Sequence, residues 1–189
     1  MSFMNTSLFS SLLFVILFSV PVSADVDIES DKLPLARDLL AESRQAACNG
    51  QPLVVMFGST TCPYCSVVRS LYIIPLMNDE RYPGIVSRDL EIDSDELVRD
   101  FSGKLVRMTE LASKYNVTLV PQVMIFGPSG KQAGKPIIGI SSEDFYGYYL
   151  DQAILAGIEM VRQKSTAETS GNNPSTDVPS ASPGGYVCD

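Results

Sequence analysis

The amino-acid sequence predicts one α/β domain in which a central sheet of about four strands is flanked by helices. Apolar runs of strand length alternate with segments whose apolar residues recur at helical spacing. The length of 189 residues, 45% of them hydrophobic, suffices for one domain of ordinary size. The predicted order is helix, strand, helix, strand, helices, strand, strand, helix.

Residues 1–24 have the pattern of a secretory signal peptide. They carry no charged side chain, contain the apolar run Leu12–Val20, and end in the small residues Val22-Ser23-Ala24. We therefore expect cleavage after Ala24 and a periplasmic or secreted protein without stable membrane insertion. Because the segment lacks Lys and Arg, an N-terminal membrane anchor is the alternative.

Residues 25–164 are expected to form the folded domain, and residues 165–189, rich in Ser, Thr, Pro, Gly and Asn, a disordered tail. The first helix is expected to be capped by Asp31, with Pro34 in its first turn, and to end at Asn49-Gly50. No element is predicted between about 103 and 108. The other expected elements are strands over 53–57, 84–92, 122–126 and 135–140, and helices over 62–78, 95–101, 109–115 (capped by Thr109) and 142–163.

The stretch Cys62-Pro63-Tyr64-Cys65 carries the chemistry, because it joins the apolar strand to the following helix. Two thiols three residues apart on a first helical turn form a redox pair. The positive end of the helix stabilises a thiolate at Cys62, and Cys65 lies one turn deeper, where it can close a disulfide. The alternatives are a structural disulfide or half of a zinc site. A zinc site would need two more ligands, and the chain has no histidine.

Two further cysteines lie outside this motif. Cys48 is expected to be a small buried apolar residue. Cys188 is expected to be an inert thiol of the tail or the partner of Cys48 in a structural disulfide. A second hypothesis is a regulatory or relay disulfide between Cys188 and Cys62.

The composition excludes several classes of function. A net charge of −8 argues against nucleic acid as a partner. The absence of histidine removes Cys–His and Ser–His catalysis and most metal sites. We expect neither a metal nor a cofactor.

The order strand, CPYC, helix, followed by ELASKYNVTLVPQVMIFGPSGK, a strand and a terminal helix, resembles the thioredoxin superfamily over residues 33–163. The likeness is greatest to exported thioredoxin-like proteins of bacterial sulfur-oxidation and periplasmic disulfide systems. It implies a thioredoxin-like fold, a nucleophile at Cys62, a resolving thiol at Cys65, and tuning of the redox potential by Pro63 and Tyr64. The Pro63-Tyr64 pair also resembles glutaredoxin.

The resemblance further implies a substrate-binding surface at Val120, Pro121 and Thr61. In that family the proline that matches Pro121 is cis, and the residue that matches Val120 offers its backbone groups to a substrate strand.

The chain departs from thioredoxin at two positions beside the motif. Thr61 stands where thioredoxin has a tryptophan, and Met56 stands where it buries an aspartate that accepts a proton. On the next strand, Arg88, Asp89 and Glu91 are the candidates to replace that aspartate.

The implied function is an exported thiol:disulfide oxidoreductase that reduces disulfides of periplasmic partner proteins and receives electrons from a membrane donor. Protein disulfides and dithiols are therefore the expected partners. The alternatives are a dithiol oxidase or isomerase, a glutaredoxin-like enzyme, and a non-catalytic module that binds proteins or handles Cu(I).

Overall fold

The computed structural model describes residues 32–140, 143–170 and Cys188. The expected signal peptide, the expected cap Asp31 and residues 171–187 of the expected tail lie outside the described residues.

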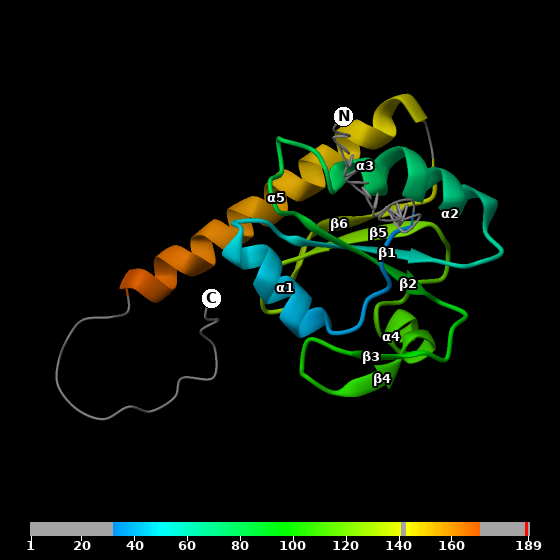
Figure 1. Cartoon of the computed structure of the whole chain (residues 1–189), viewed down its shortest axis with the longest axis horizontal. Coiled ribbons are helices and arrows are strands. Elements are labelled where there is room, and N and C mark those ends of the chain that lie inside the picture. The colour runs from blue at the N-terminus through cyan, green and yellow to red at the C-terminus, as the bar shows by residue number, and fades with distance from the viewer. Residues whose placement is uncertain (1–31, 141–142, 171–187, 189) are drawn as a thin grey trace, which may run out of the picture.

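A four-stranded mixed sheet forms the centre of the molecule (Figure 1). The strand order is β2-β1-β5-β6; β1 and β2 are parallel, and the other neighbours are antiparallel. This confirms the predicted α/β class and the predicted number of strands. The strands are β1 (Leu53–Gly58), β2 (Val86–Glu91), β5 (Gln122–Phe126) and β6 (Gln132–Ile138).

The apolar run in β1 follows from burial on both faces. Val54 and Met56 belong to one apolar cluster, whereas Leu53, Val55 and Phe57 belong to the other. All five side chains are fully buried. A strand that is covered on both sides needs no polar residue at alternate positions.

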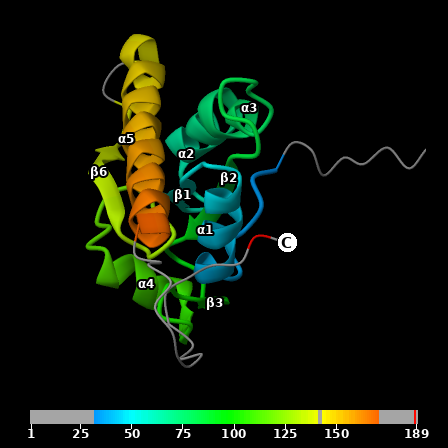
Figure 2. The same cartoon turned by 90° about the vertical axis from the view of Figure 1, so that its left-hand side faces the viewer.

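Helices cover both faces of the sheet (Figures 1 and 2). One face carries α2 (Pro63–Val68), a π-helical segment (Arg69–Ile73), α3 (Ile74–Leu76) and α5 (Glu143–Ser170). The other face carries α1 (Leu39–Cys48) and α4 (Met108–Lys114). The predicted helix over 62–78 is therefore confirmed, with a π-helical segment just before Pro75, whose ring cannot continue a regular hydrogen-bond ladder.

The first helix starts later than predicted. α1 begins at Leu39, and the Asp38 carboxylate caps it by accepting a hydrogen bond from the Ala41 N–H at 2.9 Å. The preceding residues instead run along β2, because the Ala36 N–H donates to the Asp89 carbonyl at 2.8 Å. Pro34 therefore does not lie in a helical turn. The predicted end is confirmed, since Asn49 is the C-cap.

The predicted helix over 95–101 is wrong. Residues in that range form β3 (Leu97–Arg99), which pairs with β4 (Leu105–Arg107) in the stretch for which no element is predicted. Val98 is fully buried against the sheet layer, and this contact holds the hairpin in place. Thr109 is not the cap of α4, because the helix begins one residue earlier and its N-cap is Arg107.

The last helix is longer than predicted. α5 continues to Ser170, beyond the predicted end of the helix at residue 163 and into the first residues of the expected tail. Gly157 lets this helix lie close to the sheet, because a Cβ there would come within 2.7 Å of Ile125 Cγ2 and of Pro52 Cβ. Among the described helices, none is both long and apolar enough to cross a membrane.

Cys188 forms a disulfide with Cys48. Cys48 is exposed, so its expected role as a buried apolar thiol is wrong. The Cys188–Cys62 disulfide of the relay hypothesis is absent among the described residues, since Cys62 is bonded to Cys65. Cys188 was also expected to be either an inert thiol or the partner of Cys48, and the structure shows the bond with Cys48.

Candidate active site

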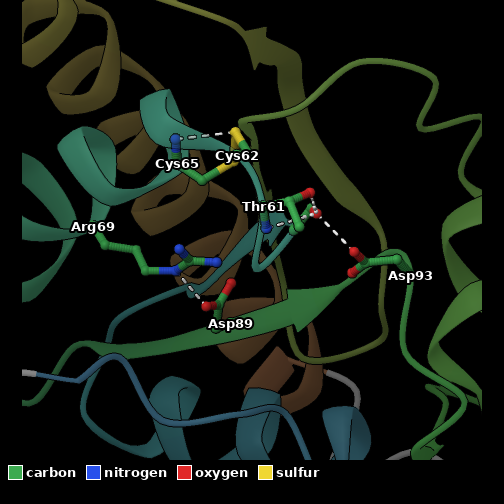
Figure 3. Close-up of a disulfide and its surroundings, with 7 residues drawn as sticks. Thr61, Cys62, Cys65, Arg69, Asp89 and Asp93 are labelled. Atoms are coloured by element: carbon green, nitrogen blue, oxygen red, sulfur yellow. Dashed lines mark hydrogen bonds and ion pairs between the residues drawn. A yellow bond between two sulfur atoms is a disulfide. The ribbon is translucent and has the colours of Figure 1, made fainter.

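The cysteine pair lies where β1 ends and α2 begins (Figure 3). β1 ends at Gly58, and a turn through Ser59 and Thr61 leads to Cys62, the N-cap of α2. The Cys62 backbone is extended, with φ −93° and ψ 107°, and Pro63 occupies the first helical position. A proline there loses no intrahelical hydrogen bond, which explains why CPYC opens a helix.

Cys62 and Cys65 form a disulfide whose two sulfurs lie in different environments. Cys65 has no exposed surface, whereas Cys62 is only partly buried. The Cys65 N–H donates a hydrogen bond to Cys62 Sγ at 3.1 Å. In the reduced protein, we expect this N–H and the positive end of the helix to stabilise a thiolate at Cys62. The geometry thus separates an accessible sulfur from a sheltered one.

Three predicted site residues lie at the surface beside this pair. Thr61, Pro63 and Tyr64 are all exposed, and Tyr64 is 66% exposed. The Tyr64 ring therefore belongs to the surface that a partner would meet and contributes little to the core.

Val120 and Pro121 come from a distant part of the chain. Val120 is partly buried against the same apolar cluster as Cys62, and Pro121 is buried just before β5. The Val120–Pro121 peptide bond is cis. The Pro121 carbonyl accepts a hydrogen bond from the Gly139 N–H at 2.8 Å, which ties this turn to the end of β6.

A buried ion pair lies beside the helix that carries the cysteines (Figure 3). Arg69, one turn after Cys65, donates from Nε to Asp89 Oδ2 at 2.5 Å. Gly58 leaves room for the pair, because a Cβ there would lie 2.6 Å from Arg69 Nη2. Burial raises the pKa of Asp89, although the hydrogen bond and charge of Arg69 act in the opposite direction. Asp89 Oδ1 is buried without a hydrogen-bond partner among the described residues.

Of the three candidates for a proton acceptor, Asp89 has the suitable position. It is the register partner of Met56, so its carboxylate stands on the strand next to the position where the resemblance implies an aspartate. Arg88 instead donates to Glu42 of α1 at 2.9 Å, on the other face of the sheet. Glu91 is only partly buried; burial raises its pKa, and neighbouring carboxylates add to the rise.

Hydrogen bonds of Ser59 hold the turn before Cys62. Ser59 Oγ donates to Asp93 Oδ2 at 2.7 Å, accepts from the Thr61 N–H at 3.3 Å, and lies 3.1 Å from Thr61 Oγ1. The Ser59 carbonyl accepts from the Cys62 N–H at 3.3 Å. Sequence reasoning missed Ser59, Asp93 and Arg69, because their contacts join residues 34 and 20 positions apart.

The order of strands and helices around the cysteine pair identifies the fold. β1 leads through the disulfide into α2, a parallel strand follows, and β5, β6 and α5 complete the sheet and its covering layer. The chain has a thioredoxin fold.

Comparisons with known proteins find similarity at the level of structure. No family model and no curated protein matches the chain. Mitochondrial thioredoxin 3 of Saccharomyces cerevisiae is 19% identical, with a TM-score of 0.44, over 66% of this chain and 95% of that one. A thioredoxin mutant of Halobacterium salinarum is 16% identical, with a TM-score of 0.45, over 66% and 93%. The periplasmic thioredoxin SoxS of Paracoccus pantotrophus is 15% identical, with a TM-score of 0.40, over 56% and 97%.

The zinc alternative for the cysteine pair would require further ligands beside it. Within residues 32–140, 143–170 and 188, no group of three or more His, Cys, Asp or Glu side chains could hold a metal ion. The sulfurs of Cys62 and Cys65 are bonded to each other.

Proposed function

We propose that the protein is an exported thiol:disulfide oxidoreductase that reduces disulfides of partner proteins. The observation that carries this proposal is the pairing of a partly exposed Cys62, which accepts a helix N-terminal hydrogen bond, with a fully buried Cys65. A structural disulfide needs no such difference between its two sulfurs. A pair that performs exchange needs one sulfur that a substrate can reach and one that reacts later.

In the first step the Cys62 thiolate attacks one sulfur of the substrate disulfide. The bond between the two substrate sulfurs breaks, a mixed disulfide forms at Cys62, and the other substrate sulfur leaves as a thiolate. Thr61, Tyr64 and the Val120-Pro121 turn provide the surface on which the substrate docks. The exposure of Thr61 and Tyr64 supports this role.

In the second step Cys65 loses its proton and attacks Cys62 Sγ. The mixed disulfide breaks, the second substrate thiolate leaves, and the Cys62–Cys65 disulfide remains, so two electrons have passed to the substrate. Asp89 accepts the Cys65 proton in this proposal. Its burial, its unpartnered Oδ1 and its bond to Arg69, one turn from Cys65, support the assignment.

The charges around the site favour reduction of substrates over their oxidation. A dithiol becomes a strong oxidant when its thiolate is well stabilised. Here Asp89, Glu91 and Asp93 stand at alternate positions at and beyond the end of β2, and only Asp89 among them pairs with Arg69. Carboxylates near a thiolate disfavour its negative charge. A membrane donor that carries a dithiol would return the enzyme to its reduced state.

Export is part of the proposal because of the signal-peptide pattern in residues 1–24. The Cys48–Cys188 disulfide supports it, since bonds of this kind persist in oxidising compartments. Fusing residues 1–24 to a reporter enzyme that is active only outside the cytoplasm tests this part of the proposal.

Insulin reduction by dithiothreitol tests the enzymatic part. The wild-type protein should accelerate the precipitation of insulin chains, and Cys62→Ser should not. Cys65→Ser should accumulate mixed disulfides that a non-reducing gel detects. Equal acceleration by wild type and Cys62→Ser would contradict the role of Cys62. No acceleration by the wild type would leave a non-catalytic binding module as the better account.

A further inference from the structure

We propose that Asp93 is a positioning residue of the dithiol site. Through Ser59 it fixes the hydrogen-bond directions of the turn before Cys62 and so keeps the donors of Thr61 away from the Cys62 sulfur. This inference rests on the proposed function and adds a residue that no sequence motif of the chain points to.

The turn before Cys62 is tied to the end of β2 at two points. The Ile92 N–H donates to the Gly58 carbonyl at 2.9 Å, and Ser59 Oγ donates to Asp93 Oδ2 at 2.7 Å. Ser59 is only 8% exposed, so its hydroxyl depends on protein partners. The carboxylate therefore holds the turn against the sheet from a position 34 residues along the chain.

The acceptor-only character of a carboxylate sets the direction of the neighbouring hydrogen bonds. Ser59 has one hydroxyl hydrogen, and Asp93 uses it. In the contact between Ser59 Oγ and Thr61 Oγ1, at 3.1 Å, Thr61 is then the donor. The Thr61 N–H also donates to Ser59 Oγ. Both donors of Thr61 are thus directed to Ser59, while the hydrogen bond to Cys62 Sγ comes from the Cys65 N–H.

Loss of the Asp93 carboxylate would allow the hydrogen bond between the Ser59 and Thr61 hydroxyls to change direction. The Ser59 hydroxyl could then donate to Thr61 Oγ1, and the Thr61 hydroxyl would be released to donate to the adjacent Cys62 thiolate. An additional donor stabilises the thiolate, and a stabilised thiolate makes the pair a weaker reductant.

Direct charge effects act on Cys62 as well. The charged groups to consider are Asp89 and Glu91 of β2, Asp93 beyond it, and Arg69 of the helical run, which pairs with Asp89. A carboxylate near a thiolate disfavours its charge, and a guanidinium favours it. A variant that retains the Asp93 charge is therefore needed to separate the hydrogen-bond effect from the charge effect.

Three substitutions separate the two effects. Ser59→Ala removes the hydroxyl through which Asp93 acts but keeps the charge. Asp93→Ala removes both, and Asp93→Asn keeps an acceptor oxygen but removes the charge. Asp95→Asn is the matched control, because Asp95 lies two residues farther on with a side chain that is 86% exposed.

The measurement is the equilibrium between the reduced and the disulfide form of the Cys62–Cys65 pair in glutathione buffers. Thiolate absorbance against pH gives the titration midpoint of Cys62 as a second readout. A hydrogen bond to a charged group changes an equilibrium constant by about tenfold or more. We expect Asp93→Ala and Ser59→Ala to shift the equilibrium about tenfold towards the reduced protein and to lower the Cys62 midpoint. Asp95→Asn should change either readout less than twofold.

The role of the Thr61 hydroxyl is tested separately in a Thr61→Val background, because valine has no hydroxyl that could donate to Cys62. There Ser59→Ala should lose most of its effect. The inference is overturned if Ser59→Ala matches wild type, or if Asp93→Ala matches Asp95→Asn. These outcomes are independent of the proposed function, which fails instead if Cys62→Ser still accelerates insulin reduction.

Discussion

Two disulfides, Cys48–Cys188 and Cys62–Cys65, lie towards opposite ends of one strand. Cys48 ends α1 and precedes β1, whereas Cys62 follows β1 and opens α2. The six residues of β1 separate them by about 20 Å. Cys62 pairs with a residue three positions away, whereas Cys48 pairs with Cys188, 140 positions away.

Their places on the helices give the two bonds different chemistry. Cys62 lies at the positive end of α2 and accepts a backbone N–H. Cys48 lies at the last residue of α1, where the negative end of the helix disfavours a thiolate. The place of each cysteine on its helix therefore makes the Cys62–Cys65 bond suitable for exchange and leaves the Cys48–Cys188 bond as a cross-link.

The largest predicted difference between the two bonds is in catalysis. Replacing Cys62 and Cys65 together by Ser should abolish insulin reduction, because no thiolate remains to form the mixed disulfide. Replacing Cys48 and Cys188 together by Ser should leave the initial rate within about twofold of wild type. A loss of more than tenfold in the second protein, with folding intact by circular dichroism, would show that both bonds take part.

For the free energy of unfolding, we expect the Cys48–Cys188 bond to matter more than the Cys62–Cys65 bond. Breaking a cross-link across a loop of 140 residues frees many conformations of the unfolded chain, so Cys188→Ser should lower the free energy of unfolding by about 3 kcal/mol. Urea denaturation measures this loss. Cys48→Ser and the double variant should each lose the same amount, because each removes the same bond. Additive losses would mean that the side chains matter apart from the bond.

A smaller effect concerns the second step at the Cys62–Cys65 pair. Asp89→Asn should slow the decay of the mixed disulfide by about a hundredfold, which is the lower end of the usual contribution of a general base. In wild type this decay should speed up as pH rises through the pKa of Asp89, which burial raises, since only the carboxylate accepts a proton. In Asp89→Asn, the decay rate should not show this increase with pH.

The control for this prediction is Glu110→Gln, which changes an exposed carboxylate that pairs with Arg107. Stopped-flow mixing with a labelled peptide disulfide separates formation of the mixed disulfide from its decay. A slower formation step with unchanged decay would contradict the role assigned to Asp89.

The sequence predicted the elements that carry a strong local signal. The apolar run of β1, the CPYC helix and the hairpin strands β5 and β6 all appear near their predicted bounds. The segment 95–101 has a helix-like pattern but forms β3, because Val98 is buried and pairs with Val106. The Ser102-Gly103 turn between β3 and β4, with Gly103 at a φ of 82°, was a local signal for this hairpin.

The site was predictable only where a motif carries it. Four cysteines allow three pairings, so the sequence left the Cys48–Cys188 bond open among alternatives. Asp89 stayed one of three candidates until the register of β1 and β2 placed it next to Met56. Contacts between distant side chains, such as Ser59–Asp93 and Arg69–Asp89 near the site, leave no periodic signal in the sequence.

The most direct test is to identify the cysteine that bonds to a substrate. The Cys65→Ser protein should be mixed with a folded protein that contains one exposed disulfide, quenched with an alkylating agent, and mapped by mass spectrometry without reduction. The account predicts a mixed disulfide at Cys62, with Cys48 and Cys188 still bonded to each other. A substrate bonded to Cys48 or Cys188, with Cys62 alkylated, would contradict it.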